Sequence, residues 1–424
     1  MITFMFTSAS TFTALAAVLA AATLAAQGAR NVQWSPAVER IATPAAIDSG
    51  QPQLSASDRG LILSWLEREG QRATLKFSER TASGWSEPRV VASGTDWFVN
   101  WADVPSVVRL ADGTLVAHWL QKSGADTYAY DVRLSHSNDD GQTWSASFTP
   151  HSDGTRTEHG FASLFQMPGA GLGLVWLDGR AMKPESAHGS HGAAGAGAMS
   201  VRFASFGRGW KQTSEIPVDL RACECCPTSA VVTSDGPIAA FRNRGDKEVR
   251  DIHVSRFENG KWTESRAVHE DGWQTAACPV NGPMLSARGR GVAIAWFTVK
   301  EEQGRALMAF STDAGRTFGP PIRLDDSGAL GRVDVELMPD GSAVASWIEF
   351  ANQRAQFRVR RVEPSGARSQ SVTVSSLAGT RASGYPRIAR YGDELVLAWT
   401  ENIGGRPQVQ TAVARSRTQT HSRR

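Results

Sequence analysis

A short apolar segment that ends in an aromatic residue recurs seven times along the chain. It reads LILSW at 61–65, LVAHW at 115–119 and LGLVW at 172–176, and it returns as IAAF, VAIAW, AVASW and LVLAW. The aromatic residues are Trp65, Trp119, Trp176, Phe241, Trp296, Trp347 and Trp399, and neighbours in this series lie 51 to 65 residues apart. A repeat of this length is typical of architectures in which one supersecondary unit is copied around a ring or along a stack.

Each repeat contains four short segments with strand character. In the first repeat they are Pro52–Ala56, Leu61–Trp65, Ala73–Ser78 and Trp85–Val91. Apolar residues alternate with polar ones, and Gly, Asp or Asn mark the breaks between segments. Four antiparallel strands per repeat, repeated radially, define a propeller blade, whereas a β-solenoid normally has a shorter period. The sequence therefore predicts an all-β, seven-bladed β-propeller with four-stranded antiparallel blades.

The two ends of the chain complement each other. The last repeat runs through Gly384–Ala389, Leu395–Trp399 and Gln408–Arg415 and then lacks a fourth strand. Val32–Pro36 resembles the fourth strand of other repeats, such as Gly84–Pro88. Closing the ring with this segment removes an exposed sheet edge. We therefore expect the N-terminal strand to complete the last blade.

The first thirty residues are typical of an export signal. Ala14–Ala26 is an uncharged run of small apolar residues, too short to cross a bilayer comfortably. Small residues between Thr23 and Ala29 allow cleavage by a signal peptidase. We assign 1–29 to a signal peptide, 30–416 to the propeller and 417–424 to a disordered tail. An uncleaved anchor is the alternative, because no Lys or Arg precedes the apolar run.

Charge gives little indication of a polyanionic partner. The chain has 45 basic and 42 acidic residues, a net charge of +3. This balance does not favour nucleic acid or an anionic membrane as the main partner. We expect no nucleic-acid binding, no stable membrane span after signal removal, and a periplasmic or secreted location.

Two segments carry the resemblance to a known family. Residues 137–144 (SNDDGQTW) and 311–318 (STDAGRTF) fit the Asp-box pattern Ser-x-Asp-x-Gly-x-Thr-Trp, with Phe for Trp in the second. Degenerate versions occur at 78–85 and 255–262. On these residues the chain resembles the sialidase-like Asp-box propellers over essentially the whole mature sequence. The resemblance implies that the boxes lie on the face opposite the active site and identify the fold.

The resemblance also implies a catalytic constellation that this chain matches only in part. Sialidases of the family have six blades, three arginines that clamp the substrate carboxylate, a tyrosine nucleophile assisted by a glutamate, and an aspartate acid/base. Their first arginine lies in a Phe/Tyr-Arg-Ile-Pro motif, where this chain has Gly50-Gln51-Pro52-Gln53. The nearest similar segment, Tyr385-Pro386-Arg387-Ile388, is in the last blade. We therefore expect little or no hydrolysis of sialic acid glycosides.

Polar residues that strands do not explain gather in the loops of one face. These are the loops that lead into first strands and the loops that join second to third strands. The candidate catalytic residues are Asp103, Glu158, Asp178, Arg180, Arg242, Tyr385 and Arg387, and the candidate ligand-binding residues are Trp97, Trp101, His159, Arg244 and Asn281. Aromatic side chains beside carboxylates and guanidinium groups suit a sugar or an anionic ligand, and a carboxylate pair can hydrolyse a glycosidic bond. The alternative is that Asp178–Arg180 and Arg242–Asp246 are solvated salt bridges.

The cysteines form the most specific local signal. Cys223, Cys225 and Cys226 precede blade four, and Cys278 occupies the equivalent position before blade five. In an exported protein we expect two disulfides, or one disulfide and two thiols, with Cys278 paired to one of the three upstream cysteines. A copper or zinc site is the alternative, for which His188 and His191 in the long third-blade loop are further candidate ligands.

Three functions are compatible with these observations. The first is an exported sialidase-like propeller that binds or hydrolyses a glycan or another anionic ligand on its loop face. The second is a metal-binding or redox-related periplasmic protein that uses the cysteine cluster, and the third is a non-catalytic interaction scaffold. We expect a monomer without a cofactor. Whether the chain is an enzyme stays open, and an enzymatic form would be a glycoside hydrolase of exo-sialidase-like type.

Overall fold

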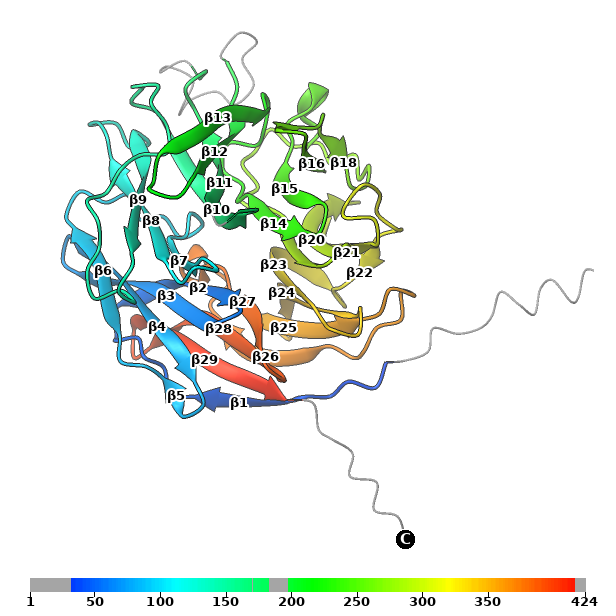
Figure 1. Ribbon diagram of the computed structural model, residues 1–424. Helices are drawn as coiled ribbons and strands as arrows, with labels where there is room; N and C mark the ends of the chain where they lie inside the picture. The colour runs from blue at the N-terminus through cyan, green and yellow to red at the C-terminus, as the bar shows by residue number, and fades with distance from the viewer. Residues whose placement is uncertain (1–31, 170, 183–196, 416–424) are drawn as a thin grey trace, which may run out of the picture.

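The computed structural model describes residues 32–169, 171–182 and 197–415, and within them seven antiparallel sheets stand around a common axis (Figure 1). This arrangement confirms the predicted seven-bladed propeller. The predicted signal peptide (1–29), His188, His191 and the predicted tail (417–424) lie outside the described residues. None of the helices among the described residues is long and apolar enough to cross a membrane.

The strands follow the repeat in chain order, and the first strand of each blade lies nearest the axis (Figure 1). Blades one to three contain β2 (Ser49–Ser57), β3 (Gly60–Glu69), β4 (Arg72–Thr81), β5 (Gly84–Trp85) and β6 (Arg89–Gly94); β7 (Ser106–Arg109), β8 (Leu115–Lys122) and β9 (Tyr130–Ser137); and β10 (His159–Met167), β11 (Gly171–Asp178), β12 (Ser200–Phe206) and β13 (Gln212–Asp219). Blades four and five contain β14 (Ser229–Thr233), β15 (Gly236–Arg242), β16 (Ile252–Glu258), β17 (Lys261–Trp262) and β18 (Arg266–Ala267); and β19 (Met284–Arg288), β20 (Gly291–Lys300), β21 (Gln303–Ser311) and β22 (Ile322–Arg323). Blades six and seven contain β23 (Gly328–Leu337), β24 (Ala343–Ala351), β25 (Arg354–Val362) and β26 (Val372–Leu377); and β27 (Arg387–Tyr391), β28 (Glu394–Ile403), β29 (Arg406–Arg415) and β1 (Ala37–Ile41). In blade two, a single bridge between Leu134 and Phe148 stands in the place of a fourth strand.

The recurring aromatic residue lies on every second strand and is buried between sheets. All seven aromatic side chains are 5% exposed or less. In four blades the indole N–H donates to a carboxylate two residues further along: Trp65 to Glu67 (2.9 Å), Trp176 to Asp178 (2.9 Å), Trp347 to Glu349 (2.8 Å) and Trp399 to Glu401 (3.0 Å). A buried Trp needs a partner for this one polar atom, and the neighbouring carboxylate provides it.

Side chains of the first strands join neighbouring blades around the channel. Ser163 Oγ donates to the Thr228 carbonyl (2.9 Å), and Ser229 and Ser286 accept from the backbone N–H groups of Leu285 (3.0 Å) and Leu337 (2.9 Å). Asp334 likewise accepts from the Ile388 N–H at 3.0 Å. These bonds satisfy backbone groups that face the channel and have no ladder partner.

The N-terminal strand closes the last blade, as predicted. β1 pairs antiparallel with the outer edge of β29, from Ala37 opposite Arg415 to Ile41 opposite Thr411, and the two ends lie side by side in Figure 1. The pairing residues are Ala37–Ile41, which directly follow the predicted segment, so the prediction that Val32–Pro36 forms this strand was wrong. Trp34 is instead buried in the core between blades six and seven, and Pro36 has no N–H to donate to a ladder.

Residues 137–144 and 311–318, the two segments with the Asp-box pattern, form the same turn after the third strands of blades two and five. Asp139 accepts from the N–H (2.9 Å) and hydroxyl (2.6 Å) of Thr143, and Asp313 accepts from Thr317 at the same distances. Gly141 has φ +82° in this turn, a left-handed conformation that favours glycine. Chain direction puts both turns at the end of the blades opposite the loops that lead into the first strands.

Candidate functional site

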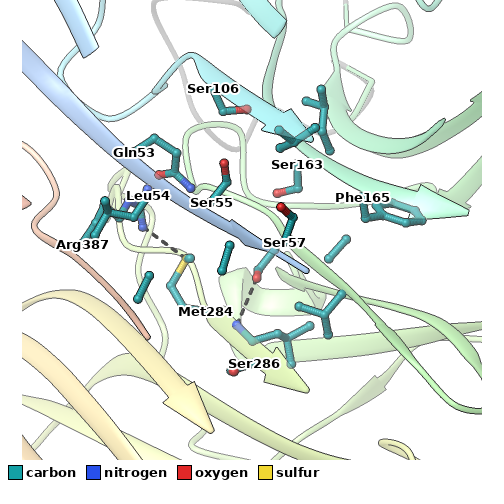
Figure 2. Close-up of a pocket in the computed structure, with 18 of the residues that line it drawn as sticks. Gln53, Leu54, Ser55, Ser57, Ser106, Ser163, Phe165, Met284, Ser286 and Arg387 are labelled. Carbon is teal, nitrogen blue, oxygen red and sulfur yellow. Dashed lines mark hydrogen bonds between the residues drawn. The ribbon is translucent and has the colours of Figure 1, made fainter. Parts of the chain in front are cut away.

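The first strands enclose a central channel with a cavity of about 1040 Å³. Figure 2 shows its hydroxyl-rich wall, with Ser55 and Ser57 of β2, Ser106 of β7, Ser163 of β10 and Ser286 of β19. We use the term loop face for the end of the channel where chain segments enter the first strands and where second strands turn to third strands. Most charged candidates from the sequence lie at this end.

Two buried groups of opposite charge, Arg387 and Asp334, lie in the channel wall near the loop face. Arg387 is 6% exposed and contacts Met284 Sδ at 3.4 Å, as Figure 2 shows. Asp334 attracts this guanidinium and accepts from the backbone N–H groups of Val335 (2.9 Å) and Ile388. Burial disfavours both charges, raising the pKa of Asp334 and lowering that of Arg387, and the attraction between the two groups only partly opposes these shifts.

Two predicted catalytic carboxyls meet at one tyrosine hydroxyl. Tyr130, the first residue of β9, places its Oη 2.7 Å from Glu158 Oε1 and 3.2 Å from Asp103 Oδ2. Asp103 and Tyr130 are buried, whereas Glu158 is half-buried. Burial raises the pKa of Asp103 to about 7 and that of Glu158 to about 8, and the charge of Asp103 adds to the second shift. We call these three residues the acid–tyrosine triad.

The segment before β7 extends over the end of the channel. Trp101 stacks on Tyr385 of blade seven, with ring centroids 5.8 Å apart. The guanidinium groups of Arg332 and Arg381 lie 4.8 and 5.9 Å from the centre of the Trp101 ring. The Tyr385 hydroxyl donates to the Val280 carbonyl. Aromatic rings and cations from blades two, six and seven therefore cover the loop-face end of the channel.

A closed set of two acids and two arginines lies in the loops at the loop-face end of blade four. Glu224 pairs with Arg244 and, at 2.9 Å, with Arg250. Glu248, in the short helix η2 (Asp246–Glu248), binds the same two arginines at 2.8 Å each. Every charge in this set has an opposite partner, so the set stabilises the loop and leaves Arg244 engaged with two carboxylates.

The four cysteines, all among the described residues, form two disulfides around Glu224. Cys223 bonds Cys226, and Cys225 bonds Cys278 with a Cα–Cα distance of 6.2 Å. The second bond joins blades four and five, which confirms that Cys278 pairs with an upstream cysteine. Both bonds leave the sulfurs without a free thiolate for a metal in this oxidised state.

Other predicted site residues lie on the loop face with structural partners. Trp97 stacks on Trp119 at 5.4 Å, and Asn281 Oδ1 accepts from the Arg332 N–H at 2.8 Å. Arg242 is 1% exposed and donates to the carbonyls of Asn281 (2.8 Å), Arg250 (2.5 Å) and Phe297 (2.6 Å).

Of the two salt bridges considered from the sequence, one forms. Asp178 and Arg180 pair at 2.7 Å, but Asp178 is fully buried and so is not a solvated group. The pair of Arg242 and Asp246 does not form. Arg242 lies buried at the end of β15, while Asp246 is exposed on η2 and pairs with Arg221 at 2.9 Å.

Four strained backbone positions lie where first strands begin. Gln51, Phe161, Val280 and Arg332 are non-glycine residues with φ between +48° and +57°. Gln51, Phe161 and Arg332 lie in β-bulges of β2, β10 and β23. Such conformations cost about 1–3 kcal/mol each and persist where surrounding structure imposes them, often at binding sites. The strain therefore marks the same end of the channel as the charged groups.

Several residues at this face were not predicted, namely Tyr130, Asp131, His151, Asp153, Glu248, Arg250 and Arg332. Tyr130, Asp131 and Arg250 lie at or beside the starts of third strands, where the loops from the second strands end. The predicted site residues were drawn only from the beginnings of these loops. Applying the same topological rule to both ends of each loop would have found these three. Arg332 lies within a bulged strand, for which the sequence gives no signal.

The buried carboxyls predict a pH dependence of stability. Burial holds the pKa of Asp103 and Glu336 at about 7, above the ordinary values of 3.8 and 4.5. The unfolded chain releases these protons at lower pH than the folded protein does, so the free energy of unfolding falls as pH rises from about 4 to about 7. We expect Asp103→Asn to raise the free energy of unfolding by about 2–4 kcal/mol at pH 8 and to leave it unchanged at pH 4. Urea unfolding across this range tests the expectation, with the exposed Asp393→Asn as control; equal gains at both pH values would contradict it.

Comparison with known proteins places the chain among propellers. No family model and no curated protein matches the sequence. A solved structure of a protein of unknown function from Dyadobacter fermentans DSM 18053 has a TM-score of 0.52 at 13% identity, covering 92% of this chain and 100% of that chain. The polysaccharide lyase Uly1 has a TM-score of 0.51 at 9% identity, covering 86% of this chain and 89% of that chain. The Hadza microbial sialidase Hz136 has a TM-score of 0.45 at 12% identity, covering 81% of this chain and 73% of that chain. At these identities the likeness to the first two establishes the fold alone.

Proposed function

We propose that this chain is an exported, sialidase-like Asp-box propeller that cleaves an anionic glycan at its loop face. The observation that carries the proposal is the acid–tyrosine triad, in which one buried hydroxyl lies between two carboxyls. Two carboxyls that share one hydroxyl cannot both ionise without repulsion, so one of them stays protonated and can act as a general acid. The two disulfides support export, because such bonds persist in oxidising compartments.

Glu158 is the group of the triad that reaches substrate. Its side chain is half-buried, whereas Asp103 and Tyr130 are enclosed. Glu158 transfers a proton to the leaving glycosidic oxygen as the glycosidic bond breaks, and a water molecule then adds to the anomeric carbon and returns a proton to the Glu158 carboxylate. The Tyr130 hydroxyl holds the Glu158 carboxyl in position. Asp103 acts through Tyr130 as a positioning residue, because it has no exposed surface from which to contact a sugar.

The aromatic and cationic side chains at the loop-face end of the channel form a subsite that suits an anionic sugar. Trp101 offers a ring for stacking, and Arg381 and Arg332 beside it favour a carboxylate or sulfate on the sugar. Arg381 is exposed, while Arg332 also donates to the carbonyls of Gly384 (3.2 Å) and Thr380 (3.1 Å). The fold shared with a protein named as a polysaccharide lyase agrees with a glycan ligand.

A screen of anionic and neutral glycans tests the proposed function. Release of reducing ends reports hydrolysis, and ultraviolet absorbance of unsaturated uronate reports elimination. On the substrate found, Glu158→Gln is expected to lower kcat at least about 100-fold, the scale of a general acid, whereas the exposed Asp246→Asn retains activity. Tyr130→Phe is expected to lower kcat about tenfold with KM unchanged, as a positioning role requires.

The outcome of the screen is decisive for the triad. Turnover of a glycan that survives Glu158→Gln would refute the assignment of the acid. Binding of a glycan without turnover would refute cleavage and favour a lectin-like role. A sialoside is expected to be a poor substrate, since the first-blade segment 50–53 has no arginine; efficient sialoside turnover that Arg387→Ala abolishes would contradict this expectation.

A further inference from the structure

Arg387 is a buried arginine in the wall of the central channel. It begins β27, the first strand of blade seven, and its side chain lines the cavity together with Gln53 and Met284 (Figure 2). Only 6% of the residue is exposed. The glycan cleavage proposed above does not use Arg387.

Arg387 differs from the other buried cations in its partners. The arginines that are buried among the described residues are Arg242, Arg244, Arg250, Arg256, Arg360 and Arg387. All of them except Arg387 donate to at least one carbonyl or carboxylate oxygen, and Arg242 donates to three. The fully buried His159 likewise faces two carboxylate oxygens, Asp131 Oδ1 at 3.3 Å and Asp153 Oδ1 at 3.4 Å. Within the described part of the chain, Arg387 donates to no oxygen atom.

The contacts of the Arg387 guanidinium are weak. Its Nη1 lies 3.4 Å from Met284 Sδ, a poor acceptor, and the group stands 5.4 Å from the centre of the Tyr385 ring. Its Nε is buried and has no hydrogen-bond partner among the described residues. Asp334 attracts the charge from a distance, because its two carboxylate oxygens accept from backbone N–H groups. Burial lowers the pKa of Arg387, so these contacts do not replace the hydration that the guanidinium has lost.

Gln53 is a second polar group without a partner in this part of the wall. It belongs to β2 of blade one and lies beside Arg387 in Figure 2. Its Oε1 is buried and accepts no hydrogen bond from the described residues, Arg387 included. An anion between the two side chains accepts from the guanidinium, and the amide can turn its N–H groups toward the same anion. A water molecule satisfies the amide equally well but does not neutralise the charge of Arg387.

The charges along the cavity favour an anion with a single charge. Glu336, near the end of β23, lies at the end of the cavity away from the loop face, where Arg288 and Arg390 oppose its charge. The carboxylate that acts on Arg387 is Asp334, which repels negative charge on a ligand. A dianion meets this repulsion twice over, whereas a monoanion matches the one guanidinium. Arg288 and Arg390 also attract anions into the cavity from its far end.

We propose that Arg387 binds a small monovalent anion, such as chloride or formate, in the central channel. The guanidinium presents Nε–H and an Nη–H on one edge, and this pair of donors suits the two oxygens of formate or a single halide ion. The cavity of about 1040 Å³ has room for the anion and its water. The anion links blade seven to blade one through Arg387 and Gln53, so it stabilises the closed ring. This role is independent of glycan cleavage, which the acid–tyrosine triad carries.

Thermal unfolding of the whole protein in a halide-free buffer, with sodium chloride, bromide or formate added, tests the site. We expect each salt to raise the melting temperature along a saturation curve, because the anion binds only the folded chain. Arg387→Met is expected to raise the half-saturating concentration at least about tenfold, the scale of a charge-assisted hydrogen bond. The control is Arg288→Met, which removes an exposed arginine from the same cavity and is expected to change the half-saturating concentration less than about threefold.

Bromide locates the anion without any variant, so the proposal stays testable even if Arg387→Met does not fold. A crystal soaked in sodium bromide is expected to show an anomalous-scattering peak within hydrogen-bonding distance of the Arg387 guanidinium. Equal stabilisation of the unmodified protein and Arg387→Met would overturn the proposal, and so would bromide peaks at other places only. A peak at Arg387 without saturable stabilisation would mean binding at crystal concentration only and would overturn it as well, leaving water as the partner of Arg387.

Discussion

A chain that begins at Ala42 is expected to aggregate instead of folding as a monomer. This truncation removes β1, which covers the outer edge of β29 over five residue pairs from Ala37 to Ile41. It also removes Trp34, a 9% exposed side chain in the core between blades six and seven. An uncovered strand edge pairs with other chains, and loss of a buried Trp side chain costs about 3–5 kcal/mol. Size-exclusion chromatography with light scattering measures the outcome.

Two matched variants separate the strand edge from the core contact. A chain that begins at Val32 keeps both Trp34 and β1 and is expected to remain monomeric. Trp34→Ala keeps the edge covered, so it is expected to lose stability without aggregating. If the chain that begins at Ala42 stays monomeric and as stable as the chain that begins at Val32, pairing of β1 with β29 does not close the ring.

The fold was predictable because every blade buries an aromatic side chain at the same place on its second strand. An aromatic side chain on each second strand fills the space between adjacent sheets, so its position recurs at the blade period. The carboxylate two residues after Trp65, Trp176 and Trp399 repeats as well, since each indole N–H needs an acceptor. Strand ends were less predictable: Trp34 resembles the Trp that precedes other fourth strands, but the ladder begins only after Pro36.

The site was predictable where topology alone places residues. The rule that first-strand starts share one face predicted Asp103 and Glu158 on the same face, and in the structure both carboxyls contact the Tyr130 hydroxyl. The rule does not give the path of a loop. Trp101 belongs to blade two and contacts Tyr385 of blade seven and Arg332 of blade six, which depends on backbone angles that no local pattern encodes.

Burial was the second property that sequence reasoning could not supply. Arg242 and Arg244 are two residues apart, and the sequence predicts the first as a catalytic residue and the second as a ligand-binding residue. Arg242 is enclosed with its donors on three carbonyl groups, whereas Arg244 pairs with Glu224 and Glu248. Residues two apart in a strand face the same side, but β15 ends at Arg242, so Arg244 belongs to the following loop and takes a different direction. Both side chains are buried, and only the assembled ring determines which partners each of them meets.

Loss of the disulfide between blades is expected to cost more stability than loss of the local one. Cys225 and Cys278 are 53 residues apart, whereas Cys223 and Cys226 are three apart. In the chain-entropy model a cross-link over about 50 residues stabilises by about 4 kcal/mol, and one over about four residues by about 2 kcal/mol. We therefore expect Cys225→Ala/Cys278→Ala to lower the free energy of unfolding by about twice as much as Cys223→Ala/Cys226→Ala.

Urea unfolding under non-reducing conditions measures this difference, and each double variant serves as the control for the other. Both remove two sulfurs from the loops that precede blades four and five, so they differ mainly in the length of chain that the bond closes. Peptide mapping of the unmodified protein first establishes the pairing, because Cys223 and Cys225 are close enough to exchange partners, with their Sγ atoms 4.0 Å apart. Equal losses from the two variants would contradict a role for the second bond in holding blades four and five together. A larger loss from Cys223→Ala/Cys226→Ala would mean that the local bond, by fixing the loop that carries Glu224, stabilises the loop face more than the bond between blades does.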